Sequence, residues 1–201
     1  MAEMVEAFDV TRVSANPARF DLKKAEAINA THVRELPVEE YVARVVPFLA
    51  GAGLVADPPS PEQDRVLRAI APLAQERTVV LSDAVGLLGF LFSDEVAIDP
   101  AAAAKNLRPE DGEVLDAAAG ALRDLADWSA AGIEQALKAA LVDGLGRKPR
   151  QAFGPVRVAV SGRTVSPPLY ESIELLGRER TLARLAAARA VVGSAPGPTA
   201  G

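Results

Sequence analysis

The amino-acid sequence predicts an all-α fold, and three observations favour that class. Alanine, leucine and valine dominate an apolar fraction of 49%, whereas aromatic residues make up only 4%. A core of alanine, leucine and valine with few aromatic residues suits closely packed helices better than a sheet. Apolar residues also recur at spacings of three and four, and helix-start and helix-stop residues separate these segments. The 201 residues suffice for one large domain or two small ones.

The first two expected helices follow an amino-terminal loop around Asn16-Pro17. A helix over residues 20–33 should bury an apolar stripe on one face. That stripe comprises Leu22, Ala25, Ile28 and Val33. Pro37 should start the second helix, which ends at Gly51 and Gly53.

Two further helices are expected between residues 60 and 92. Ser60-Pro61-Glu62-Gln63 combines a hydroxyl cap, a proline at the first helical position and a glutamine at the third. This helix should run to about Gln75. Ser82 is expected to cap the next helix, which extends through Leu91-Phe92.

The second half of the chain predicts at least four more helices. One runs from Pro109 to about Leu125, and Ser129 should cap the one that follows. The segment Val156-Arg157-Val158-Ala159-Val160 alternates like a strand, but a single strand in a helical chain has no pairing partner. We therefore predict a short helix begun by Pro155. Residues 166–176 and 178–192 complete the set.

Charge is distributed unevenly along the chain. Residues 147–201 hold nine Lys/Arg against three Asp/Glu, which leaves 13 against 24 in residues 1–146. A polyanion would therefore prefer the carboxy-terminal part, although a solvated helix surface would give the same pattern. No apolar stretch approaches the roughly 20 residues of a membrane helix, and the first residues lack a basic signal-peptide start. We expect a cytoplasmic chain.

The sequence offers no catalytic or metal site. It has no cysteine and a single histidine, His32, so no thiolate or histidine cluster can form. The phosphate-binding GxxxxGK[ST] loop, the GxSxG elbow and the HExxH pair are all absent. The remaining candidates are the basic residues, because arginine binds phosphate bidentately or lies flat on an unstacked base. From the residues alone, RNA binding and a helical protein-interaction module stay equally open.

Blocks spread along about residues 1 to 190 decide between these alternatives, because they follow one another in the order found in bacterial-type glutamyl-tRNA synthetases (glutamate–tRNA ligases). The blocks are Phe20-Asp21-Leu22-Lys23-Lys24, Ile28-Asn29-Ala30-Thr31-His32-Val33, Glu76-Arg77-Thr78 with Leu81, Phe90-Leu91-Phe92, Leu107-Arg108-Pro109, Asp127-Trp128-Ser129, residues 154–162, Ser166-Pro167-Pro168 and Leu175-Leu176-Gly177-Arg178-Glu179-Arg180. The chain therefore resembles the carboxy-terminal, anticodon-binding region of that family. Ile28 departs from it, since many relatives carry an aromatic residue there.

The resemblance implies a helical cage made of two small subdomains that hold splayed anticodon bases. Residues 1–36 would end the stem-contact region, residues 37–94 and 95–192 would form the two subdomains, and residues 193–201 a flexible tail. Arg77 would face the first anticodon base. The residues that would contact the other bases are Arg157, Ser166, Pro167 and Leu169. From charge alone, we assign Arg147, Lys148, Arg150 and Arg163 to phosphates.

The same resemblance implies tRNA(Glu) as the partner, leaves tRNA(Gln) open, and makes the parent enzyme a class I glutamate–tRNA ligase. The two nucleotide-binding signatures of that family, of the His-Ile-Gly-His and Lys-Met-Ser-Lys types, are absent from this sequence. ATP and magnesium are thus implied for a parent catalytic domain, not for these residues, which should be catalytically inactive alone. Either an excised piece of the enzyme or a free-standing paralogue would have this sequence.

Overall fold

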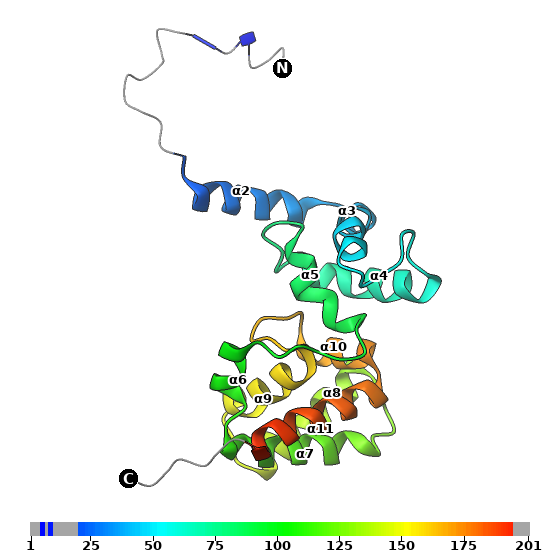
Figure 1. Ribbon diagram of the computed structural model, residues 1–201, viewed down its shortest axis with the longest axis vertical. Coiled ribbons are helices and arrows are strands. Elements are labelled where there is room, and N and C mark those ends of the chain that lie inside the picture. The colour runs from blue at the N-terminus through cyan, green and yellow to red at the C-terminus, as the bar shows by residue number, and fades with distance from the viewer. Residues whose placement is uncertain (1–4, 7, 10–19, 195–201) are drawn as a thin grey trace.

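The computed structural model describes residues 5–6, 8–9 and 20–194, and all regular structure in these ranges is helical. The predicted all-α class is confirmed. Figure 1 shows two groups of helices joined end to end, α2 to α5 at one end and α6 to α11 at the other. Most of the predicted amino-terminal segment, and residues 195–201 of the predicted tail, lie outside the described residues. No described helix is long and apolar enough to cross a membrane.

The first group packs four helices and a 3-10 turn around a small apolar core. Its elements are α2 (Leu22–Glu35), α3 (Val38–Gly51), α4 (Pro61–Gln75), α5 (Asp83–Leu88) and the 3-10 turn η2 (Gly89–Leu91). The predicted start of α4 is confirmed, because the Ser60 hydroxyl accepts from the Gln63 N–H while the Gln63 side chain accepts from the Ser60 N–H. The prediction that Ser82 caps α5 is wrong. Its side chain makes no capping bond, and Asp83 accepts from the preceding loop instead.

The apolar stripe predicted for the first helix is only partly buried. Val33 is buried, but Leu22 and Ile28 remain 62% and 51% exposed. The helix itself starts two residues after the predicted residue 20, because the Asp21 carboxylate accepts from the Lys24 N–H and caps it. The polar side chain of Gln75 anchors its other end by donating to the carbonyls of Val33 and Leu36. Periodicity thus found the helix but not the extent of its burial.

The second group forms a larger core in which α11 lies along α7 and α9, and α10 lies on α8. Its elements are α6 (Pro100–Asn106), η3 (Pro109–Asp111), α7 (Gly112–Arg123), α8 (Ala130–Leu137), η4 (Lys138–Gly144), α9 (Pro149–Ser161), α10 (Leu169–Leu176) and α11 (Arg178–Ser194). The cap by Ser129 is confirmed, since its hydroxyl accepts from the Gly132 N–H. The predicted helix from Pro109 to Leu125 is split into η3 and α7, and η4 continues α8 as a π-helix.

The helix α9 begins six residues earlier than predicted. Pro149 occupies the first helical position and Pro155 lies inside the helix. An internal proline removes one backbone donor, here the N–H that would reach the carbonyl of Gln151, but helical packing continues on both sides of it. Ala152, Pro155 and Val156 are all buried on the same face. The alternating pattern of residues 156–160 is therefore part of a helix that is buried on most sides.

Candidate nucleic-acid interface

A hollow of about 470 Å³ lies where the two groups of helices meet. The first group lines it with Arg77, Ser82, Asp83, Gly86 and Leu87, and the second group with Asp99, Arg163, Thr164 and Val165. Two arginines face two aspartates here, so the formal charges balance. Both carboxylates accept backbone hydrogen bonds, Asp83 from residues 79 and 80 and Asp99 from residue 101. The hollow thus offers donors and acceptors without a net charge.

The loop between α9 and α10 forms one wall of this hollow, and Gly162 sets its course. This glycine has φ of +74°, and a Cβ there would lie 2.4 Å from the carbonyl oxygen of Ala97. The Gly162 carbonyl also accepts from the Asp99 N–H at 2.9 Å. The left-handed conformation and the close approach both require glycine. As a result, the loop is held against the segment that connects the two groups.

Arg157 supports the same loop from beneath. Its guanidinium donates to the Ser166 hydroxyl at 2.5 Å and to the Pro167 carbonyl at 3.0 Å. Burial lowers the pKa of Arg157, and the like charge of Arg77 lowers it further. Arg77 thus lies close enough to Arg157 for their charges to interact, and Arg157 in turn contacts Ser166 and Pro167. However, Arg157 points its donors at its own loop.

Leu169, which the resemblance implies as an anticodon contact, is buried. It is the first residue of α10 and only 5% exposed, within the apolar core. Ser166 is similarly buried, at 4%. The residues that the loop exposes are instead Arg163, Thr164 and Val165. The Arg163 guanidinium lies over Gly86, where a Cβ would be 3.5 Å from its Cζ.

A second hollow, of about 710 Å³, lies on the other side of the loop and shares Thr164 with the first. Its charged lining consists of Lys105, Arg108, Arg150, Arg157 and a single acid, Asp111. Asn106 and Gly154 also line it, and a Cβ at residue 154 would lie 2.5 Å from Asn106 Oδ1. Unlike the first hollow, this one has an excess of positive charge.

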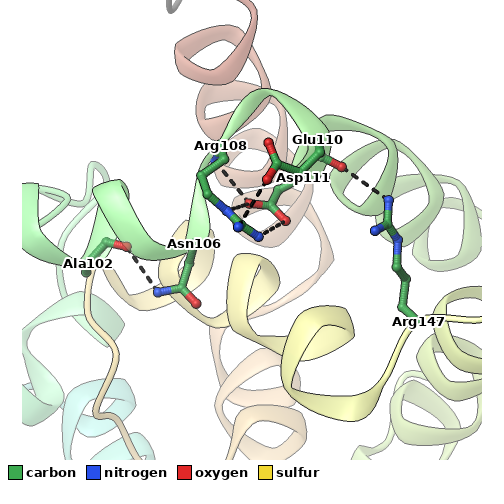
Figure 2. Close-up of polar contacts among 6 residues, drawn as sticks. All are labelled: Ala102, Asn106, Arg108, Glu110, Asp111 and Arg147. Atoms are coloured by element: carbon green, nitrogen blue, oxygen red, sulfur yellow. Dashed lines mark hydrogen bonds and ion pairs between the residues drawn. The ribbon is translucent and has the colours of Figure 1, made fainter. Parts of the chain in front are cut away.

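Figure 2 shows how acidic residues hold the arginines beside this hollow. Arg108 donates to the buried carboxylate of Asp111, with its Nε 3.1 Å from Oδ2, and pairs with Glu110 at 3.0 Å. In the same view, Arg147 comes from the opposite side and donates to the Glu110 carbonyl at 3.4 Å. Arg147 also lies 3.5 Å from the carboxylate of Glu113. Much of the charge of Arg108 and Arg147 is thus already compensated.

Two of the other three basic residues of the predicted phosphate set, Lys148 and Arg150, differ from Arg147. Lys148 and Arg150 are exposed, and within the described residues neither forms an ion pair or a side-chain hydrogen bond. Lys105, Asn106 and Arg108 also line the second hollow, and they were not predicted as site residues from the sequence. The sequence feature that could have identified them is the short basic segment directly before Pro109. No group of residues suited to hold a metal ion occurs in the described part of the chain.

Comparison with known proteins identifies the class of this fold and surface. A family model described as an anticodon binding domain matches residues 40–189, and the chain belongs to that family. It is similar to the glutamate–tRNA ligases of Saccharopolyspora erythraea, with 59% identity over 92% of the chain, and of Mycobacterium marinum, with 57% identity over 96%. The chain spans only 37% and 38% of the length of these relatives.

Solved structures support the same fold. A crystal structure of a glutamate tRNA ligase from Elizabethkingia meningosepticum superimposes with a TM-score of 0.73 at 22% identity, covering 95% of this chain and 36% of that one. The glutamate-tRNA synthetase of Elizabethkingia anophelis gives a TM-score of 0.68 at 22% identity, over 94% and 36% of the two chains. The resemblance to glutamate–tRNA ligases found in the sequence is therefore confirmed.

Proposed function

We propose that this chain binds the anticodon arm of tRNA(Glu) as part of a glutamate–tRNA ligase, the enzyme that attaches glutamate to tRNA at the expense of ATP. ATP and magnesium would then belong to a parent catalytic domain, and the assembled enzyme would work in the cytoplasm. The observation that carries this proposal is the pair of hollows of unequal charge that meet at Thr164. A single-stranded loop offers phosphates and unstacked bases side by side, which are the two kinds of group that these hollows suit.

The charge-balanced hollow suits a base. A phosphate placed there would meet Asp83 and Asp99 as well as Arg77 and Arg163, so its attraction would be largely cancelled. A neutral base edge can instead pair with an arginine donor on one side and a carboxylate acceptor on the other. Arg77 is the donor that we assign to this base. The hollow is also within the size range of ordinary ligand sites.

The positively charged hollow suits the RNA backbone. Lys105 and Arg150 add positive charge and form no ion pair within the described residues, whereas Arg108 is held in place by Asp111. Lys148 lies beside Arg150 in the sequence and is exposed too. Contacts of this type give affinity and depend on salt, but they do not read sequence.

Fluorescence anisotropy with labelled anticodon stem-loops tests the proposal. We expect the stem-loop of tRNA(Glu) to bind more tightly than an unrelated stem-loop of equal length, and both affinities to fall as salt increases. A stem-loop of tRNA(Gln) shows whether that tRNA is accepted. Equal affinity for tRNA(Glu) and unrelated stem-loops at all salt concentrations would contradict anticodon recognition, and no binding at low salt would contradict RNA binding altogether.

A further inference from the structure

Two arginines of α11 reach across the junction between the two groups of helices. Arg184 donates through Nη2 to the carbonyls of Phe90 and Ser93, at 2.7 and 2.6 Å. Arg180 donates through Nη1 to the carbonyl of Leu91 at 2.9 Å. All three carbonyls lie at the end of α5 and η2, where the last carbonyls of a helix lack backbone partners and carry partial negative charge. Hydrogen bonds from these two side chains therefore hold the carboxy-terminal end of the first group.

Arg184 also connects this junction to the helix that leads into the candidate site. Its Nη1 donates to the carbonyl of Val160 at 2.7 Å, in the last turn of α9. That carbonyl lies three residues before Arg163 and next to the turn at Gly162. A single guanidinium thus joins the first group, the connecting segment and α9.

The burial of Arg184 indicates that its role is more than packing. The residue is 4% exposed, and within the described part of the chain it forms no ion pair with a carboxylate. Burial, followed by the like charge of Arg180, lowers the pKa of Arg184 to about 10. Burying a cation costs free energy that an apolar side chain of similar volume would not. What the arginine adds is a fixed geometry among three carbonyl groups from different segments.

We propose that Arg180 and Arg184 are positioning residues that set the distance between Arg77 on the first group and the 161–168 loop on the second. The inference rests on the proposed function, because that distance matters only if the hollow between the groups receives a base. The helix α10 also packs against α4 and η2 and so joins the groups, but packing contacts are less directional than hydrogen bonds. Hydrogen bonds from a rigid guanidinium permit much less movement.

Distance measurements between two spin labels test the positioning directly. The chain has no cysteine, so labels attach only to introduced ones. Ala43→Cys on α3 and Ala139→Cys on η4 place one label in each group at exposed positions. We expect a single narrow distance distribution for the parent protein, and a broader or shifted one for Arg180→Met and Arg184→Met. Arg178→Met is the matched control.

Arg178 suits this purpose because it lies on the same helix and also donates to helix-end carbonyls, those of Arg123 and Leu125, but within the second group. All variants are measured well below their midpoints of thermal unfolding. If Arg184→Met does not fold, Arg180→Met, which loses a single bond across the junction, carries the test. Unchanged distributions in the folded variants would overturn the inference.

Binding of stem-loops provides the second readout. If the competent arrangement falls to about a fifth of the population, the preference for the tRNA(Glu) stem-loop over an unrelated one should fall about fivefold. The Arg178→Met control should keep the parent preference. A parent protein without any preference would refute the proposed function, while the distance distributions would still decide the role of the two arginines. Broadened distances with a full preference would refute the link between this junction and the site.

Discussion

Replacement of Arg77 by glutamine distinguishes a base-reading arginine from a structural one. Arg77 is exposed, and its Nη1 donates to the carbonyl of Leu73 at 3.0 Å, one turn earlier in α4. This bond caps the end of the helix, so a purely structural role is a real alternative. The resemblance instead implies contact with the first anticodon base. A structural role predicts that Arg77→Gln lowers mainly stability, whereas a base-reading role predicts that it lowers mainly discrimination between bases.

The structural loss should be small. An exposed hydrogen bond of this kind stabilises by about 0.5–1 kcal/mol, which corresponds to about 1–4 °C in unfolding temperature for a chain of this size. Removing the charge also relieves the repulsion that lowers the pKa of Arg157, and this offsets part of the loss. A bidentate contact to a base edge discriminates by about 1–3 kcal/mol, or roughly 5- to 150-fold in relative affinity. Discrimination should therefore change far more than stability.

Stem-loops that differ from the tRNA(Glu) anticodon at one base each provide the assay. We expect Arg77→Gln to lose discrimination at one of the three positions, the first according to the resemblance, and to keep it at the others. Arg68→Gln is a matched control on the same helix, since Arg68 pairs with Asp64 away from the hollow. The reasoning is refuted if Arg77→Gln lowers the unfolding temperature but leaves all three affinity ratios as in the parent.

Three further predictions concern charge, backbone conformation and pH. Joint replacement of Lys148 and Arg150 by alanine should weaken all stem-loops alike and reduce the slope of log affinity against log salt by about 1–2, and an unchanged slope would place both residues outside the interface. Gly162→Ala should lower the free energy of unfolding in urea by at least about 1–2 kcal/mol, because the residue is left-handed and faces a carbonyl oxygen; an unchanged midpoint would contradict this. Burial raises the pKa of Tyr41 above its ordinary value of about 10, so its stabilising contribution is complete below pH 10 and is lost as pH rises through the folded-state pKa. The unfolding temperature of Tyr41→Phe should therefore fall less between pH 9 and 11 than that of the parent protein. If the two plots of unfolding temperature against pH are parallel, ionisation of Tyr41 does not control stability in this pH range.

Helix positions could be predicted where local chemistry decides them. The Ser60 box and the Ser129 cap depend on residues three positions apart, so the sequence contains the whole interaction. The start of α9 could not be found in this way, because both Pro149 and Pro155 suit a first helical position and only tertiary packing selects between them. The exposure of Ile28 has a similar cause. Periodicity identifies an apolar face but not what covers it.

For charged residues of the candidate site, the sequence likewise does not show which partners the fold brings to them. In the sequence, Arg147 and Arg150 are two basic residues in one acid-free segment, and charge alone gives them the same role. In the structure, Arg147 meets Glu113, which is 34 residues away, whereas Arg150 lines the positively charged hollow. Arg157 illustrates a different case, because the resemblance implies that it contacts an anticodon base but its donors hold Ser166 and Pro167. Under the proposed function, Arg157 would act on an anticodon base through the shape of the loop that exposes Arg163, Thr164 and Val165. Recognition would then depend on how rigidly that loop is held. The rigidity cannot be predicted from sequence patterns, because the residues that contact the loop come from both groups of helices.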